Sequence, residues 1–593
     1  MSSLTQLVRR FAFGGFAALI LLLPALPVPD FWITQSNFIG LYTLVALGLV
    51  LLTGVGGLTS FGQAAFVGVG AYTAAFLAVK LNMSPWLTLV VGIGLSVAAA
   101  LVLGAITLRM SGHYLPLATI SWGLALNYTM ANMEWLGKYD GILGVPAVEF
   151  FGWSLGSGRG LHNLIWIFVL LSAIAVTHLL DSRPGRAIRS LKNGSQMAEA
   201  MGISTFRYKL LIFVYAAVLA AISGWLFAHF QRAVNPTPFS IAKGIEYLFM
   251  AVLGGVGHVW GALIGAGAVR IIEDELQMLL PQLIGTSGNF ETVVFGILLV
   301  VVLKYAPDGL WPFIERRFPA PPRIRNWHDA PALPLRDHPQ PQELVLDVQA
   351  VRKEFGGLVA VNDVSFQIRS GEIVGLIGPN GAGKSTTFNL ITGMLELTSG
   401  AVAFRGDLIN GLPSRQIARR GISRTFQHVK MVPEMTVLDN VALGGYLRSH
   451  NGSVRAMLRL DRAEEKQLFA EAQRQLDRIG MGDKLDELAG NLALGQQRLM
   501  EIARALCTDP SLLLLDEPAA GLRHKEKQAL GDVLRQLRTE GMTLLLVEHD
   551  MDFVMSLTDR IVVMEFGTKL MEGTPAEVQA SPAVRAAYLG TEH

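Results

Sequence analysis

The feature that most constrains this chain is a series of long apolar segments confined to its first 300 residues. That part holds 15 Lys and Arg and 11 Asp and Glu, which is 26 of the 96 charged residues in a sequence of 593. Several segments approach the roughly 20 apolar residues that a helix needs to cross a bilayer. Because 593 residues are too many for one domain, we expect an N-terminal all-α polytopic membrane domain followed by a soluble domain.

The N-terminal segment is open to two interpretations. Arg9 and Arg10 precede the apolar run FAFGGFAALILLLPALP, which is also the pattern of a signal peptide. Because further apolar segments follow directly, we favour a first membrane helix. The spans expected before the first long polar loop are 11–28, 37–54, 61–80, 86–108, 114–132 and 162–180.

The polar loop from Asp181 to Lys209 fixes the orientation. It carries six Lys and Arg residues against two acidic residues, Asp181 and Glu199. An excess of Lys and Arg in a short loop indicates the cytoplasmic side, and Arg9 and Arg10 indicate the same side for the N-terminus. An even number of spans must therefore separate the two, and six are expected.

Downstream of this loop, residues 208–230 and 290–304 are clear spans. The stretch from Ser240 to Ile272 is long for one helix and contains Gly254, Gly255 and Gly257. We split it there into two shorter or re-entrant segments, which gives about ten segments in all; a single flexible, tilted helix is the alternative. Broken backbone inside a membrane is tolerated only where protein or a water-filled cavity covers it, so the split is a candidate pore feature.

A proline-rich segment separates the two halves. Residues 307–341 contain nine of the 26 prolines, which predicts an extended, semi-rigid linker. Four arginines (Arg316, Arg317, Arg323 and Arg325) suit it to the lipid surface or the cytoplasmic face. The expected domains are 1–306 (membrane), 307–342 (linker) and 343–593 (soluble). The single cysteine, Cys507, excludes disulfides and thiolate metal clusters within one chain, and the net charge of +2 gives no indication of nucleic acid as a partner.

The soluble half contains a phosphate-binding loop. Two segments rich in branched apolar residues predict strands, and the second runs into GPNGAGKST, residues 378–386. The glycines allow backbone amides to surround phosphates, Lys384 neutralises charge, and the Ser385 hydroxyl holds Mg²⁺. The residues expected to bind ATP are Phe355, Gly378, Asn380, Gly381, Gly383, Lys384, Ser385 and Thr386. Phe355 would stack on adenine, with packing in the core as its alternative.

Catalytic residues are expected at the ends of two further strands. The run LLLLDEP places Asp516 where it can hold Mg²⁺ through water and Glu517 where it can polarise the attacking water. The run LLLVEHD ends a strand at His549, which can contact the γ-phosphate. Gln427 is expected to sense Mg²⁺ and the membrane domain together. The predicted catalytic residues are Glu517, His549 and Gln427, and the predicted Mg²⁺ ligands are Ser385, Gln427 and Asp516.

These motifs, in this order, resemble the ATPase domain of ABC transporters over roughly residues 343–590. The resemblance implies an α/β P-loop fold and a head-to-tail ATPase dimer, in which the phosphate loop of one subunit faces the signature motif of the other across one ATP. The signature residues here are Leu492, Ala493, Gly495 and Gln496. The amides of Gly495 and Gln496 would face the γ-phosphate.

Two positions depart from the family pattern. Ala493 stands where the family usually has serine, whose hydroxyl bonds the γ-phosphate, and Arg523 stands where it usually has Asp or Asn. Both lie on the surface that this chain would lend to a partner. One hypothesis is therefore an asymmetric pair, in which this chain offers a weakened signature to a different ATPase. The alternative is that backbone amides suffice and both sites work.

The membrane half is similar to the larger permease subunit of the branched-chain amino acid importers. The matching runs are LTSFGQAAFVGVGAYTAA, GHYLPLATISWG, SRPGRAIRSLKNGSQMAEAMGISTFRYKLLIFVYAAVLAAISGWLFA, MAVLGGVGHVWGALIGA and LLVVVLKYAPDGLW. The soluble half is similar to the ATPase subunits of the same importers, through EFGGLVAVNDVSF, GQQRLMEIARAL, DEPAAGL and LLVEHDM. The chain therefore resembles a fusion of subunits that are usually separate.

The resemblance implies roles for further residues and partners. The coupling helix would comprise Glu199, Ala200, Met201 and Gly202 and would meet the ATPase near Gln427. Ser60, Gln63, Gly68 and Gly70 would lie in or beside the substrate pathway, with helix packing as the alternative. The implied partners are a periplasmic substrate-binding protein and a second permease and ATPase, with a heteromer favoured over a homodimer. The implied location is the bacterial inner membrane, with the ATPase in the cytoplasm and ATP with Mg²⁺ as cofactors.

The transported substrate stays open. Relatives of this permease also carry urea, short amides and aromatic acids, and YDGILGVP, residues 139–146, departs from the glycine-rich segment of many relatives. An ABC exporter would more often have six long helices per ATPase, and a non-transporting regulatory protein would not need intact Glu517 and His549. We therefore expect an ATP-driven importer of branched-chain or related hydrophobic amino acids.

Overall fold

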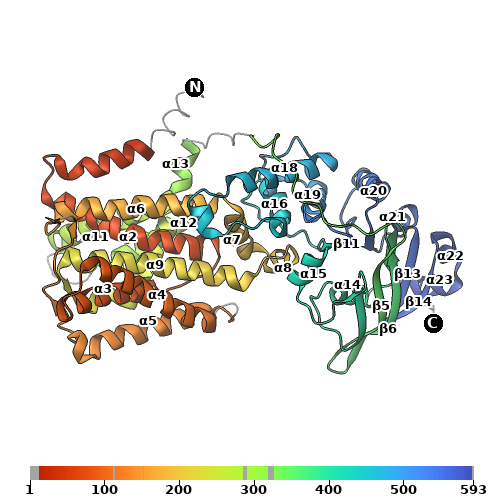
Figure 1. Cartoon of the computed structure of the whole chain (residues 1–593), viewed down its shortest axis with the longest axis horizontal. Coiled ribbons are helices and arrows are strands. Elements are labelled where there is room, and N and C mark those ends of the chain that lie inside the picture. Colours follow the sequence, from red (N-terminus) through yellow and green to blue (C-terminus); the bar gives the residue numbers. More distant parts are fainter. Residues whose placement is uncertain are drawn as a thin grey trace. The chain divides into compact units, whose positions relative to one another are not determined.

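The computed structural model describes residues 13–110, 114–150, 152–284, 290–306, 308–317 and 326–589. The chain divides into two units (Figure 1). The helical unit comprises Met1–Asp181 and Phe206–Pro322, and the α/β unit comprises Ser182–Thr205 and Arg323–His593. The segment Ser182–Thr205, which we call the coupling segment, therefore belongs to the α/β unit although it lies within the permease half of the sequence.

The helical unit contains apolar helices of membrane-spanning length. Its main elements are α2 (Asp30–Leu49), η2 (Val50–Val55), α3 (Gln63–Lys80), α4 (Pro85–Thr107), α5 (Tyr114–Asn132), α6 (Gly158–Leu180), α9 (Thr205–Gln231), α10 (Ile241–Gly255), α11 (Val259–Ile284), α12 (Phe290–Tyr305) and α13 (Trp311–Arg317). Within the described ranges, five helices are long and apolar enough to cross a membrane, or six if α10 and α11 form one span. The expected count of about ten segments is not confirmed.

The first expected span, residues 11–28, falls partly outside the described residues, as do Arg9 and Arg10. Its described part forms a shorter apolar helix from Phe13 to Ala25. Two short antiparallel strand pairings occur in the loops of the helical unit: β1 (Ile142–Leu143) pairs with β4 (Ala233–Val234), and β2 (Glu149–Phe150) pairs with β3 (Trp153–Ser154). The first pairing links the loop after α5 to the loop after α9.

The break predicted within Ser240–Ile272 is confirmed. Helices α10 and α11 meet at 119° across a break of a few residues, and Gly255 and Gly257 adopt positive φ angles of 128° and 92° that favour glycine. A Cβ atom on Gly254 would lie 1.8 Å from the Gly261 carbonyl oxygen, so the two helices approach closely only because the side chain is absent. The π-helix η2 packs on the same break, since a Cβ on Gly54 would lie 2.6 Å from the Gly257 nitrogen.

The α/β unit is built on a six-stranded sheet with the order β10-β11-β12-β7-β13-β14. Its strands are β7 (Ile373–Ile377), β10 (Ile422–Arg424), β11 (Leu512–Asp516), β12 (Leu544–Val547), β13 (Arg560–Glu565) and β14 (Thr568–Gly573), all parallel to their neighbours except β14. Because β7, β11 and β12 are buried at every position, their continuous apolar runs form the sheet core. The residues after these three strands meet at one sheet edge.

A second, antiparallel sheet has the order β6-β5-β8-β9, formed by β5 (Leu344–Phe355), β6 (Leu358–Arg369), β8 (Ser399–Phe404) and β9 (Asp407–Leu408). The helices of this unit are α7 (Arg183–Asn193), α8 (Ser195–Ala200), α14 (Lys384–Ile391), α15 (Ser414–Arg420), α16 (Val437–Ala442), η5 (Leu443–Arg448), α17 (Ser453–Met457), α18 (Arg462–Arg478), α19 (Leu494–Leu506), α20 (His524–Thr539), α21 (Met551–Leu557), α22 (Pro575–Ala580) and α23 (Pro582–Leu589). Two apolar clusters fill the space between the sheets and these helices.

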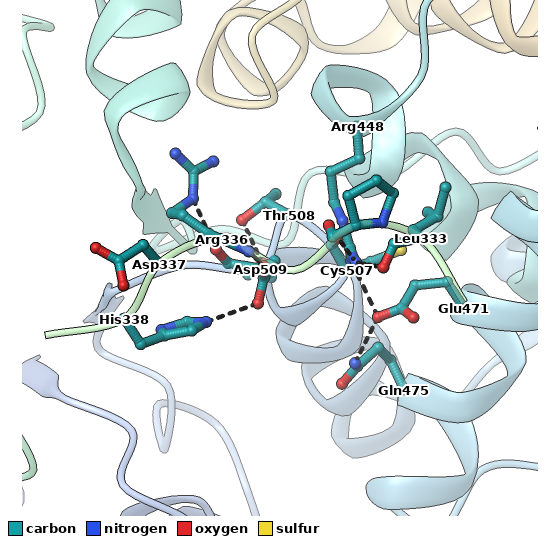
Figure 2. A network of polar contacts seen from close by, with 12 residues as sticks. Leu333, Arg336, Asp337, His338, Arg448, Glu471, Gln475, Cys507, Thr508 and Asp509 are labelled. Atoms are coloured by element: carbon teal, nitrogen blue, oxygen red, sulfur yellow. Dashed lines mark hydrogen bonds and ion pairs between the residues drawn. The ribbon is translucent and has the colours of Figure 1, made fainter. Parts of the chain in front are cut away.

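Within the predicted linker, residues 308–317 and 326–342 are described, and residues 326–342 are bound along the α/β unit. Trp327 is only 2% exposed and donates its indole N–H to Gln473 Oε1 at 2.9 Å. Arg336 donates from Nε to the Asp509 carbonyl at 3.1 Å, and Arg448 donates to the carbonyl of Leu333 (Figure 2). We call residues 326–342 the strap. Arg323 and Arg325 lie outside the described residues, so their predicted role at the lipid surface stays a prediction.

We expect Arg336→Ala to loosen the strap without affecting the rest of the unit. The change removes hydrogen bonds from a charged donor to the carbonyls of Asp509 and Arg419, each typically worth about 1.5–3 kcal/mol. Limited proteolysis of the strap is therefore expected to accelerate about tenfold or more. Asp337→Asn is the matched control, because its carboxylate is 92% exposed. Equal cleavage of both variants and the wild type would contradict this role.

Candidate functional site

The loop between β7 and α14 can be built only with glycine at particular positions. Gly378, Gly381 and Gly383 have φ angles of 153°, 83° and 93°, which L side chains rarely adopt. A Cβ on Gly378 would lie 2.2 Å from the Met564 carbonyl oxygen, and one on Gly383 would lie 2.5 Å from the Ala360 carbonyl oxygen. The predicted phosphate loop is thus fixed by backbone geometry as well as by sequence.

A lysine lies at the centre of this loop. Lys384 is 7% exposed and donates from Nζ to the carbonyls of Gly378 and Pro379 at 2.8 and 2.9 Å. Burial lowers the pKa of Lys384, while the nearby carboxylates of Glu517 and Asp516 raise it. Ser385 and Asn380 are exposed and Thr386 is half-buried, so the loop presents hydroxyl groups next to a buried cation, as a phosphate site requires.

Asp516 ends β11 as a buried carboxylate, 6% exposed. Its Oδ2 lies 3.7 Å from Arg424 Nη2, and its Oδ1 has no hydrogen-bond partner among the residues that the structure describes. Burial raises the pKa of Asp516, and Arg424 lowers it. A buried carboxylate oxygen left without a donor fits a hydrated divalent cation, which prefers oxygen ligands.

The three predicted catalytic residues converge on one carboxylate. Gln427 Nε2 donates to Glu517 Oε2 at 3.1 Å, and His549 Nδ1 lies 3.8 Å from the same oxygen. Glu517 has a positive φ of 45°, and its backbone N–H donates to the Val547 carbonyl at 2.8 Å, which ties it to the end of β12. Strained backbone of this kind is characteristic of functional positions.

Buried ionic residues that sequence reasoning missed hold this arrangement. Glu548 is fully buried and accepts hydrogen bonds from the backbone of Ala519 at 2.7 Å and of His549 at 3.0 Å. It thereby fixes the turns after β11 and β12 against each other. Burial raises the pKa of Glu548, and these backbone donors lower it. The only signal in the sequence is an acidic residue directly after an apolar strand, next to the more conspicuous histidine.

A second such set comes from α19. Arg498 donates from Nη1 to the Phe426 carbonyl at 2.7 Å and from Nη2 to the Gln427 carbonyl. Glu501, one turn further on, accepts from the Lys430 backbone at 3.3 Å, and burial raises its pKa to about 7. The signature helix therefore positions the backbone around Gln427. Its i, i+3 spacing of Arg and Glu resembles an ordinary surface pair, which is why the sequence does not reveal this role.

Ala493 is the N-cap residue of α19, with φ −64° and ψ 155°. Its methyl group cannot accept a hydrogen bond, and the cap contact that the structure shows runs from the Ala493 backbone N–H to Gln496 Oε1 at 3.3 Å. Leu492 and Gly495 are buried and Ala493 is exposed. The departure from serine therefore removes a side-chain cap of the helix, and the loss of a phosphate contact at this position stays a prediction.

The second departure lies next to the first. The Arg523 backbone N–H donates to Glu526 Oε2 at 2.8 Å, and the other oxygen of this carboxylate, Oε1, is 2.9 Å from the position that a Cβ on Gly495 would occupy. A carboxylate thus lies beside the signature glycine, with Arg523 at the start of the same helix.

We expect Ala493→Ser to stabilise the α/β unit. The new hydroxyl would accept from a free backbone N–H in the first turn of α19, and such a cap typically contributes about 1 kcal/mol. The free energy of unfolding, measured by denaturant titration of the full chain, should rise by about this amount. Leu494→Ser is the control, since that residue is 45% exposed but lies one position inside the helix. An equal gain in both variants would argue against capping.

Phe355 lies at the end of β5 with its ring 44% exposed. Lys353 Nζ is 5.0 Å from the ring centroid. The ring is therefore on the surface and not in the core. At the surface it is accessible to a stacking partner.

The coupling segment packs on helices of the α/β unit. Gly202 has a φ of 82°, and a Cβ there would lie 2.4 Å from Leu447, so this residue is held closely against η5. Helix α8, which includes Ala200, packs on α15, and Met201 is buried. Glu199 Oε1 accepts from the Thr205 hydroxyl at 2.8 Å. Gln427 contacts Glu517, and its predicted position near this segment stays a prediction.

A buried ion pair anchors the same segment. Arg186 and Glu465 are 2% and 3% exposed and form two hydrogen bonds, Nη1 to Oε2 at 2.8 Å and Nη2 to Oε1 at 3.1 Å. The Arg183 backbone N–H also donates to Glu465 Oε1, at 2.6 Å. The arginines of this loop, which the sequence presents as a topology signal, therefore also bind the α/β unit.

The four predicted pathway residues are held in tightly packed positions of the helical unit. A Cβ on Gly70 would lie 2.3 Å from the Ala221 carbonyl oxygen, and one on Gly68 would lie 2.8 Å from Met130 Sδ. Ser60 and Gln63 are 2% and 1% exposed. Their side-chain polar atoms have no hydrogen-bond partner within the described ranges.

Three features on one parallel sheet define an ATP-binding cassette: a glycine-rich phosphate loop, a buried carboxylate at the end of a strand, and a signature helix. The same chain also contains a helical membrane unit. Family models match at three places: "Branched-chain amino acid transport system / permease component" at residues 32–303, "ABC transporter" at 361–520, and "Branched-chain amino acid ATP-binding cassette transporter" at 568–593.

Individual proteins match the cassette. The high-affinity branched-chain amino acid transport ATP-binding protein LivG of Salmonella typhimurium is 45% identical over 249 residues, which cover 42% of this chain and 98% of that protein. The corresponding BraF protein of Pseudomonas aeruginosa is 41% identical over 249 residues, with the same coverage. This chain belongs to the family of branched-chain amino acid ABC transport systems and contains their permease and their ATP-binding component. It is an importer subunit that binds ATP and couples its hydrolysis to transport, and the exporter alternative is not favoured.

Proposed function

We propose that this chain imports branched-chain amino acids across the bacterial inner membrane, receiving them from a periplasmic binding protein. The observation that carries the proposal is that one chain matches both the permease and the ATP-binding component of the same kind of transport system. The convergence of Gln427 and His549 on the Glu517 carboxylate supports an intact hydrolytic site. Urea, short amides and aromatic acids remain the alternatives to be tested.

In the proposed mechanism, the phosphate loop and Lys384 bind the β- and γ-phosphates of ATP. Mg²⁺, held by Ser385 and Gln427 and through water by Asp516, would neutralise charge that develops on the phosphates. Glu517 polarises the attacking water, and His549 lies beside it to contact the γ-phosphate. Arg498, on the signature helix, holds the backbone of Gln427, and the Gln427 side chain contacts Glu517. When the signature helix closes on a partner, it would therefore move Gln427 and its contact with Glu517.

The proposed assembly is a heteromer with a second permease and a second ATPase. Ala493 and Arg523 support it, because both lie on the surface that this chain would lend to the partner's ATP. In that arrangement the site formed with this signature is the weaker of two. Near-equal hydrolysis at both sites of the assembled complex would contradict the asymmetry, and robust turnover by the isolated chain would show that it pairs with itself.

The proposed substrate is tested by uptake in host cells that carry or lack the gene. Radiolabelled leucine uptake should depend on the gene and should be competed by isoleucine and valine, while urea and benzoate should not compete. Gene-dependent uptake of urea or benzoate, without leucine uptake, would assign one of the alternative substrates.

A further inference from the structure

A cavity of about 530 Å³ opens in the helical unit between α2, α9 and α10, and none of the four pathway residues predicted from the sequence is among its described lining residues. Its lining includes the aromatic rings of Phe38, Tyr42 and Phe227, the charged side chains of Lys243 and Glu246, and four uncharged polar residues, Gln231, Asn235, Thr237 and Ser240. Pockets of this size, apolar with a few convergent polar groups, are typical of small-molecule sites.

The cavity lies toward the external face. Helix α9 has 27 residues and is about 40 Å long. Its N-terminal end follows the basic, cytoplasmic coupling segment, so Gln231 at its other end lies at the opposite face of the membrane. Gln231 lines the cavity, as does Ser240 at the start of α10. The cavity is therefore on the side of the membrane from which an imported molecule arrives.

Lys243 and Glu246 form an ion pair within the membrane segments. The Nζ and Oε1 atoms are 2.6 Å apart, and the side chains are only 16% and 19% exposed. Lys243 Nζ also lies 4.7 Å from the centroid of the Tyr42 ring. Charged residues within membrane spans are costly, and where they line a cavity they mark a substrate or ion pathway.

The neighbouring charges have partners of their own. Arg270 donates from Nε to Gln35 at 2.8 Å and pairs with Asp274 at 3.0 Å and Glu273 at 3.4 Å. Lys243 and Glu246 are therefore the charged residues among the described lining of the cavity, one of each sign and one helical turn apart.

We propose that this cavity binds a zwitterionic amino acid with a branched aliphatic side chain on its way into the permease. The Lys243 ammonium binds the α-carboxylate, the Glu246 carboxylate binds the α-ammonium, and the rings of Phe38, Tyr42 and Phe227 contact the side chain. Each charged group of the amino acid then has a protein group of opposite charge within reach. Binding replaces the ion pair between Lys243 and Glu246 by two ion pairs with the ligand, so no charge is left without a partner. The inference rests on the proposed function, because it names the site at which that substrate is recognised.

The test uses the full chain, reconstituted with the proteins that co-purify with it, and measures radiolabelled leucine uptake and basal ATP turnover. Lys243→Gln and Glu246→Gln should each raise the KM for leucine about tenfold or more while basal turnover stays within about twofold. Glu134→Gln is the matched control, since it disrupts an exposed ion pair with Lys138 in the same unit. It should leave the KM unchanged.

Two leucine analogues separate recognition from a structural role. Leucinol lacks the carboxylate and 4-methylpentanoate lacks the ammonium group. Neither should compete with leucine in the wild type, whereas 4-methylpentanoate should begin to compete in Glu246→Gln and leucinol in Lys243→Gln. A higher KM with unchanged analogue ranking would overturn the proposed contacts.

Ala242→Phe tests the proposed binding site if the charge variants cannot be recovered from membranes. Ala242 lines the cavity and is exposed to it, so the larger side chain fills the space without removing a charge. Uptake should be lost while basal ATP turnover persists. If the wild type carries leucine and Ala242→Phe does so equally well, the site is wrong and the function stands. If the wild type carries no leucine, the proposed function fails and the site fails with it.

Discussion

Glu517→Gln is expected to lower ATP turnover at least about 100-fold, because removing a positioned general base typically costs 10²–10⁴ in rate. The amide cannot accept a proton from the attacking water, whereas ATP binding depends on the phosphate loop and Lys384 and should persist. The variant is nearly isosteric, so the contacts to Gln427 and His549 change little in shape. The measurement is phosphate release from the reconstituted complex, together with nucleotide binding at equilibrium.

Asp532→Asn is the control for this prediction, since it removes an exposed carboxylate of α20 in the same unit. It should leave turnover unchanged. Residual turnover above about one tenth of the wild type in Glu517→Gln would mean that Glu517 is not the general base of the active site.

Glu465→Ala is expected to separate ATP turnover from transport. It leaves the Arg186 guanidinium buried without its bidentate partner, and breaking a buried pair in this way typically costs about 3–5 kcal/mol. The coupling segment should therefore detach from η5 and α18, while Glu517 and the phosphate loop stay intact. Leucine uptake is expected to fall about 100-fold, with ATP turnover retained but no longer stimulated by substrate.

Hydrogen exchange provides the structural measurement for this variant. Amides of residues 183–203 should lose protection in Glu465→Ala, whereas those of β7, β11 and β12 should not. Restoring an ion pair in the double variant Arg186→Glu and Glu465→Arg should recover part of the uptake. If uptake falls while protection of the coupling segment is unchanged, the ion pair does not act through this contact.

The sequence was sufficient for the parts of the site that lie on regular elements. The phosphate loop, Asp516, Glu517 and His549 follow apolar strands, and parallel strands bring their carboxyl ends to one edge whatever the loops do. The break at Gly254–Gly257 was also predictable, because clustered glycine interrupts an apolar helix. These features depend on short-range pattern and on sheet topology alone.

Long-range contacts were not predictable in the same way. The coupling segment and the strap bind the α/β unit through Arg186, Trp327 and Arg336, and nothing in their local sequence specifies Glu465, Gln473 or Asp509 as partners. Arginine in a short loop favours a cytoplasmic location and is also suited to a buried ion pair. The sequence alone therefore does not distinguish these two roles of an arginine. The number of spans is uncertain from sequence because apolar helices shorter than a bilayer, such as α10, resemble parts of longer ones.

Coupling of ATP hydrolysis to inward movement of branched-chain amino acids can be followed by measuring both quantities in the same vesicles. ATP is trapped in the lumen, where it energises only molecules whose cassette faces inward, and leucine with the binding protein is supplied outside. Leucine should accumulate against its gradient, and ATP consumption should rise when leucine is added. Accumulation without ATP, or ATP consumption that ignores leucine, would contradict the account.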